Sequence, residues 1–162
     1  MALPSYARFT LNGVTLEGDT SIGVMGGVDV SSEHIEVFEV RWGTAVPPTG
    51  STRSRLDVQP VLITKRVDQS TPRLYEAMGR STVLEGDIKL FDTHPASGET
   101  RHRFTLTIGK ARVQGIESCS PDSLNPDTAS RPAREVVTIT AASLTYRDEV
   151  SNTEYTQEMT AR

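Results

Sequence analysis

Three extended segments of this chain, residues 35–42, 56–67 and 135–147, place apolar residues at both odd and even positions. A strand with one face in water should instead alternate between apolar and polar residues. In the first segment, for example, the adjacent residues Val37 and Phe38 are both large and apolar. Either such a strand contains a bulge that shifts the alternation by one residue, or both of its faces are covered, one by the core and the other by a second subunit.

Strand patterns occupy most of the remaining chain. Residues 6–11 alternate and lead into Asn12-Gly13, a strong signal for a two-residue hairpin turn. Further strands are expected over residues 14–16, 87–91, 103–116 and 154–159. At 162 residues the chain is expected to form a single domain over residues 1–162. The predicted fold class is all-β, mainly β with one short helix, as a compact barrel or sandwich.

One short helix is specified by residues 70–79. Ser70 supplies a hydroxyl N-cap, and Pro72 lies in the first turn, where its missing N–H costs nothing. Gly79 is placed to end the helix. A helix of this length is unstable alone in water and must pack on the sheet. Its apolar stripe consists of Leu74, Ala77 and Met78.

Composition excludes several classes of protein. No apolar run approaches the ~18 residues of a membrane span, and residues 1–5 show no pattern of a secretory signal. The single cysteine, Cys119, cannot form an internal disulfide. The net charge is −4 and no basic run exists, which argues against binding to nucleic acid or to anionic membranes.

No catalytic, cofactor-binding or metal-binding constellation is visible. The three histidines, His34, His94 and His102, do not fall in a zinc-binding spacing. No serine lies in a nucleophile elbow, and the glycines at 23, 26 and 27 form neither a dinucleotide fingerprint nor a P-loop. The sequence therefore predicts no enzyme activity and no cofactor, and it favours a function in shape and assembly.

Three stretches of the chain resemble the Hcp (haemolysin-coregulated protein) family, the tube proteins of bacterial type VI secretion systems. The most specific stretch is TKRVDQSTPRL at residues 64–74, which is similar to a strand that runs into the short helix of that family. The stretches at 35–43 and 135–146 resemble two of its strands. The matching motif residues are Thr64, Lys65, Asp68, Ser70, Thr71, Pro72 and Leu74.

The resemblance implies a compact β-barrel of the type found in Hcp and phage tail tubes. Six copies would form a ring, and rings would stack into a hollow tube that a contractile sheath expels together with a VgrG-type spike. Effector proteins would occupy the lumen, and the chain would pass from the cytoplasm out of the cell through this apparatus. The alternatives are the tube of a related contractile injection system and a protein that mainly serves as an effector carrier or chaperone.

Two groups of residues receive specific expectations. The polar loop at residues 47–55 corresponds to the loop that reaches the adjacent ring in the family, although a plain surface loop is the alternative; it comprises Pro47, Pro48, Thr49, Gly50, Ser51, Thr52, Arg53, Ser54 and Arg55. The predicted core includes Trp42, Phe104, Leu106 and Ile108.

Overall fold

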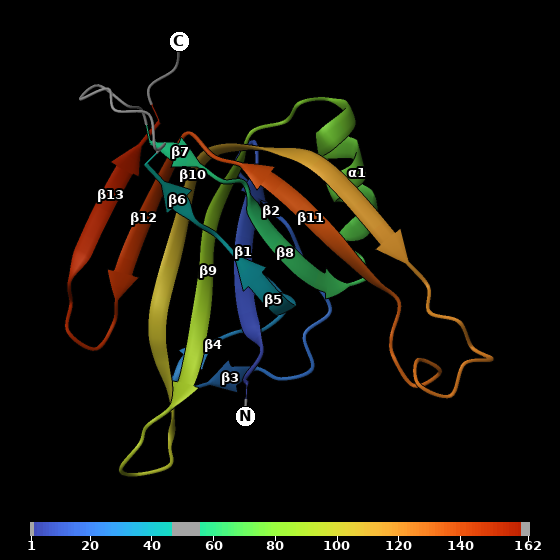
Figure 1. Cartoon of the computed structure of the whole chain (residues 1–162), viewed down its shortest axis with the longest axis horizontal. Coiled ribbons are helices and arrows are strands. Elements are labelled where there is room, and N and C mark those ends of the chain that lie inside the picture. Colours follow the sequence, from blue (N-terminus) through green and yellow to red (C-terminus); the bar gives the residue numbers. More distant parts are fainter. Residues whose placement is uncertain (1, 47–55, 160–162) are drawn as a thin grey trace.

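The computed structural model describes residues 2–46 and 56–159 (Figure 1). One helix, α1 (Thr71–Gly79), lies beside a large antiparallel sheet. The strands are β1 (Ser5–Leu11), β2 (Val14–Thr15), β3 (Val24–Met25), β4 (Val28–Asp29), β5 (Ile35–Arg41), β6 (Thr44–Ala45), β7 (Asp57–Val58), β8 (Val61–Arg66), β9 (Leu84–Thr93), β10 (Thr100–Cys119), β11 (Arg134–Thr140), β12 (Ser143–Asp148) and β13 (Glu154–Glu158). The all-β class is confirmed, with a single short helix among the described residues.

Strand pairing in the large sheet returns to its starting point. The order β11-β8-β5-β1-β9-β10 is closed by a further pairing between β10 and β11. The 20-residue strand β10 makes this possible, because its first half pairs with β9 and β12 and its second half pairs with β11. The main hydrophobic core lies inside this circuit, and β12 and β13 extend the sheet beyond it.

A bulge explains part of the double apolar pattern of β5. The pairing register between β5 and β8 shifts between Val37 and Glu39. Val37 is buried and Val40, three residues later, packs against the same core. The inserted residue moves the later residues to the opposite face, which accounts for Val40 in the core. Phe38 follows Val37 directly, points to the opposite face and is 40% exposed, so the bulge accounts for only part of the double apolar pattern of this strand.

The segment 135–147, predicted as one strand, is two strands. β11 and β12 pair with successive parts of β10 and are separated by a break at residues 141–142. The break changes the parity, so Ile139 and Leu144 both face the core although one is odd and the other even. Residues 56–67 are likewise divided into β7 and β8, with Pro60 between them.

The helix agrees with its predicted span to within one residue at its N-terminal end. Ser70 occupies the N-cap position, but its hydroxyl bonds to Asp68 rather than to a backbone N–H of the first turn. Gly79 is the last helical residue, and Arg80 forms the C-cap. The buried residues Leu74 and Ala77 pack the helix against the core.

The prediction of core residues is right for β10 and wrong for Trp42. Leu106 and Ile108 are fully buried, and Phe104 is half-buried at the margin of the core. Trp42 is 36% exposed, because β5 ends at Arg41 and the indole lies beyond the strand, stacked on the Phe104 ring at 6.0 Å between centroids.

Replacing Trp42 with Ala should therefore lower the free energy of unfolding of a single subunit by only about 1–2 kcal/mol, the value of an aromatic pair with partial burial. A fully buried indole would cost roughly 3–5 kcal/mol. Urea denaturation monitored by far-ultraviolet circular dichroism measures the difference, because the substitution removes the only tryptophan. A loss in the upper range would contradict the exposed placement.

Residues 17–34, which we call the strap, cover part of the outer face of the sheet (Figure 1). The strap contains the short hairpin of β3 and β4. Val30 of the strap packs with Tyr6 of β1 and Phe91 of β9 in a second, smaller hydrophobic cluster. The strap is thus held on a face of the sheet that points away from the main core.

Candidate assembly surfaces

The motif residues build a buried polar network around Lys65. The Lys65 side chain is fully buried on β8, and its Nζ lies 2.6 Å from Oε1 of Glu135 and 3.0 Å from Oδ1 of Asp68. The same ammonium donates to the carbonyl oxygen of Arg66 at 2.7 Å and to Oγ1 of Thr71 at 3.3 Å. Both carboxylates are buried as well, so each charged group finds an oppositely charged partner inside the protein rather than in water.

Asp68 links this network to the start of α1. Its Oδ1 accepts the backbone N–H of Ser70 at 2.9 Å, and its own N–H donates to Oγ1 of Thr71 at 3.1 Å. Burial by itself would raise the pKa of Asp68, but the hydrogen bonds from Ser70 and the Lys65 ammonium hold that pKa below its ordinary value. The carboxylate is therefore an anionic anchor that fixes the direction in which the chain enters the helix.

Sequence analysis identified Lys65, Asp68 and Thr71 but missed Glu135 as their partner. Thr71 Oγ1 donates to Oε1 of Glu135 at 2.8 Å, and Ser118 Oγ donates to Oε2 at 3.1 Å. The sequence feature that could have indicated Glu135 is a carboxylate at the start of an apolar strand. Glu135 of β11 pairs with Lys65 of β8, and this pairing places the carboxylate opposite the ammonium. The network ties β8, α1, β10 and β11 together and serves the fold.

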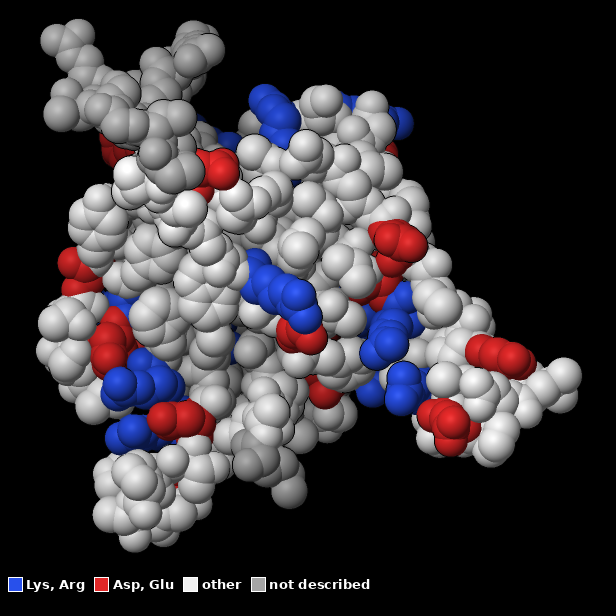
Figure 2. Space-filling view, viewed as in Figure 1, with Lys and Arg blue, Asp and Glu red and all other residues white. Residues whose placement is uncertain are grey.

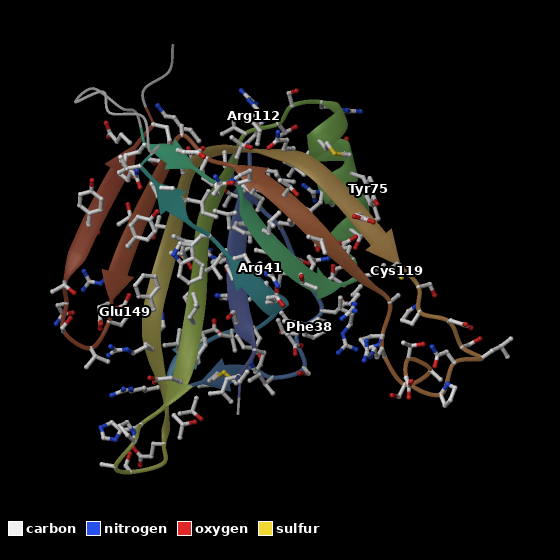
Figure 3. The ribbon with its side chains drawn as sticks, in the orientation of Figure 1. Phe38, Arg41, Tyr75, Arg112, Cys119 and Glu149 are labelled. Carbon is white, nitrogen blue, oxygen red and sulfur yellow. The ribbon has the colours of Figure 1, made fainter. Side chains whose placement is uncertain are left out.

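Three motif residues lie outside this network, and one of them, Leu74, is buried in the main core. Thr64 points to the opposite face of β8 from Lys65, as alternation requires, and Pro72 lies in the first turn of α1. At the outer end of the network, the Tyr75 hydroxyl lies 2.7 Å from Oγ of Ser118. Tyr75 is exposed on the side of the molecule that also carries Cys119 (Figure 3).

A row of aromatic residues lies at the margin of the main core, on β10, β12 and β13 and just after β5. Tyr146 of β12 and Tyr155 of β13 are stacked with 6.5 Å between ring centroids, and Trp42 is stacked on Phe104. Tyr155 is 62% exposed. We call these four residues the aromatic row. Figure 2 shows a mostly uncharged area left of the centre of the molecule, where Figure 1 places β10 and β12.

A second group of uncovered apolar residues lies on the outer face of β5, β8 and β11. Phe38 and Val136 are exposed there, and Leu62 is half-buried. The guanidinium of Arg66 lies 5.6 Å from the centre of the Phe38 ring, a cation–π contact. We call Phe38, Leu62 and Val136 the strand-face patch; Figure 3 shows Phe38 near the ends of β5 and β8.

The outer face of β1, β9, β10 and β12 is polar and hollowed. An open hollow of about 640 Å³ is lined by hydroxyl groups, by side chains of both charges and by a few apolar residues. The polar and charged lining includes Arg8, Thr10, Asp87, Thr107, Ser143 and Glu158, and the apolar lining includes Ala142 and Met159. The polar and charged side chains suit a face that stays in contact with water.

Within residues 2–46 and 56–159, no group of three His, Cys, Asp or Glu side chains is arranged to hold a metal ion, and no helix there is long and apolar enough to cross a membrane. The predicted ring-stacking loop, residues 47–55, lies outside the described residues.

Comparison with known proteins identifies the family. The family described as "Type VI secretion system effector, Hcp" matches residues 14–148. Similar solved structures include Hcp1 from E. coli EAEC 042 (19% identity, TM-score 0.81, covering 98% of this chain and 100% of that one) and the secreted protein Hcp3 from Pseudomonas aeruginosa (21%, 0.75, 98% and 99%). No curated protein sequence gives a significant match. Because the family match spans most of the sequence, the chain belongs to the Hcp family of type VI secretion tube proteins.

Proposed function

We propose that this chain is a structural subunit that forms six-membered rings, which stack into a hollow tube. The observation that carries the proposal is the separation of its surfaces. The aromatic row and the strand-face patch leave apolar side chains uncovered, whereas the hollowed face of β1, β9, β10 and β12 is polar. Uncovered apolar groups favour contact with another copy, and a polar face suits a water-filled lumen.

The two apolar surfaces are unlike each other, which favours a ring over a symmetric dimer. The aromatic row is rich in flat rings, and the strand-face patch combines aliphatic groups with Phe38 and the cationic Arg66. When two different patches of the same subunit meet, each copy binds the next head to tail, and a closed ring results if the rotation closes. Residues 1–162 act in this proposal as one tube domain.

The partners follow from the family. We assign a contractile sheath outside the tube, a VgrG-type spike at its tip and effector proteins in the polar lumen. The subunit itself carries out no catalysis and leaves the cytoplasm through the type VI apparatus. A protein that mainly carries effectors would form the same assembly, because the polar surface that lines the tube would also bind the effectors.

Negative-stain microscopy of the purified chain should show six-fold annuli, and at high concentration stacked tubes. Tyr155→Asp should convert the annuli to smaller species. The substitution places a carboxylate in the aromatic row, and this charge would lose its hydration when the row contacts the next subunit. Leu124→Asp is the matched control, since Leu124 is 91% exposed in the loop between β10 and β11. A strictly monomeric wild-type protein at high concentration would contradict the proposal.

The same images test the segment at residues 47–55. Deleting residues 49–54 should preserve single annuli and shorten the stacks, because that segment is assigned to contact between rings. If the deletion abolishes the annuli themselves, the assignment of the segment to stacking is wrong.

A further inference from the structure

His34, at the end of the strap, occupies a buried site that fits only a neutral imidazole. The His34 residue is only 5% exposed. The Nε2 atom of its ring lies 3.2 Å from Nζ of Lys89. An ammonium can only donate, so Nε2 must accept and the ring proton must lie on Nδ1. Nδ1 is itself buried without a hydrogen-bond partner among the described residues.

The charges around His34 come from three elements. On β9, Lys89 also donates to Oδ1 of Asp87 at 2.7 Å, so the ammonium is held in place beside the imidazole. On β1, Arg8 pairs with Glu33 of the strap at 2.9 Å. Asp29 of β4 also faces the ring.

The net effect of these surroundings favours the neutral ring. Burial, and then the Lys89 ammonium, hold the pKa of His34 below its ordinary value, and the carboxylates of Asp29 and Asp87 only partly oppose this.

His34 lies where the strap rejoins the sheet. The residue directly precedes β5, and its N–H donates to the carbonyl oxygen of Ser31 at 2.8 Å. The strap is also attached by the small cluster of Val30 with Tyr6 and Phe91 and by the exposed Arg8–Glu33 pair. At its other end, Gly18 and Asp19 are hydrogen-bonded to Asp68 and Gln69. An exposed pair contributes about 0–1 kcal/mol, so on β1 and β9 the strap is held mainly by the small cluster, beside a titratable group.

We propose that His34 makes the strap a pH-sensitive clasp, closed when the imidazole is neutral and released from β1 and β9 when it is protonated. Protonation replaces the hydrogen bond from Lys89 with two cations at 3.2 Å in a buried site. The released histidine has its ordinary pKa near 6.5. Because the closed state binds the proton less well, closure is fully stable above that pH and loses stability as the pH falls below it.

Hydrogen–deuterium exchange of the assembled protein at pH 7.5 and 5.5 tests this, after correction for intrinsic exchange rates. Amides of the strap should lose protection several-fold at the lower pH, while those of β10 keep theirs. His34→Gln should abolish the difference, because the amide cannot take up a proton and its oxygen can still accept from Lys89. Lys89→Met should lessen the difference by removing the repelling charge.

Two control variants separate the possible sources of a pH effect. His94→Gln should leave the wild-type loss unchanged, since His94 lies in the β9–β10 turn, where its Nδ1 accepts backbone N–H groups of Ala96 and Ser97. His102, stacked on Phe91, also has a pKa lowered by burial. Equal strap protection at both pH values in the wild type, or a loss that persists in His34→Gln and disappears in His102→Gln, would overturn the proposal.

Discussion

Replacing Lys65 with Met should lower the free energy of unfolding by about 3–5 kcal/mol, the cost of removing one partner from a buried ion pair. The loss arises because Glu135 and Asp68 are both buried against the ammonium. Without the ammonium, neither carboxylate is exposed enough for water to solvate its charge. Removing the ammonium also leaves the carbonyl oxygen of Arg66 without this donor. Chemical denaturation of the single subunit, monitored by circular dichroism, measures the effect.

Two variants define what the Lys65 result means. Arg80→Met removes an exposed pair with Glu76, so it should change the free energy of unfolding by less than about 1 kcal/mol. Adding Glu135→Leu to Lys65→Met should recover part of the lost stability. The two substituted side chains are both apolar, so the Glu135 carboxylate is no longer buried without its cation. If Lys65→Met is no worse than Arg80→Met, the network does not hold α1 to the sheet.

The sequence motif predicts which residues of this network are present, but not how they meet. Lys65, Asp68 and Thr71 are close in the chain, so their contacts follow from the turn into the helix. Glu135 is 70 residues away from Lys65, and only the pairing of β8 with β11 places it opposite the ammonium. Register is set by turns and long-range packing together, which a single sequence does not specify.

The double apolar pattern shows a related limit. Residues 35–42 predict either a bulge or two covered faces, and the bulge after Val37 accounts for Val40 in the core. The break at residues 141–142 carries no Gly or Pro to mark it. The sequence therefore predicts one continuous strand over residues 135–147, which is wrong. Phe38 stays uncovered after the bulge is taken into account, and covering it is the task assigned above to a second subunit.

Gly86→Ala should be the most damaging small substitution on the sheet, lowering the free energy of unfolding by about 4 kcal/mol or more. A Cβ at this position would lie 1.9 Å from the carbonyl oxygen of Arg8 and 2.8 Å from the Phe9 ring. Gly86 pairs with Phe9 in the β1–β9 ladder, and a backbone oxygen cannot rotate away as a side chain can. The β1–β9 ladder would therefore have to separate along a seam that borders both the main core and the polar hollow.

Gly43→Ala is the matched control for this substitution, because a Cβ there meets nothing within 4 Å. It should change the free energy of unfolding by no more than about 0.5 kcal/mol. Both variants add the same methyl group and remove the same backbone freedom from the unfolded chain. The difference between them therefore reports the contacts of the new Cβ with Arg8 and Phe9, together with the positive φ of Gly86. If Gly86→Ala and Gly43→Ala unfold at the same urea concentration, β1 and β9 must be far enough apart at residue 86 to accommodate a methyl group, which would contradict the close contact described above.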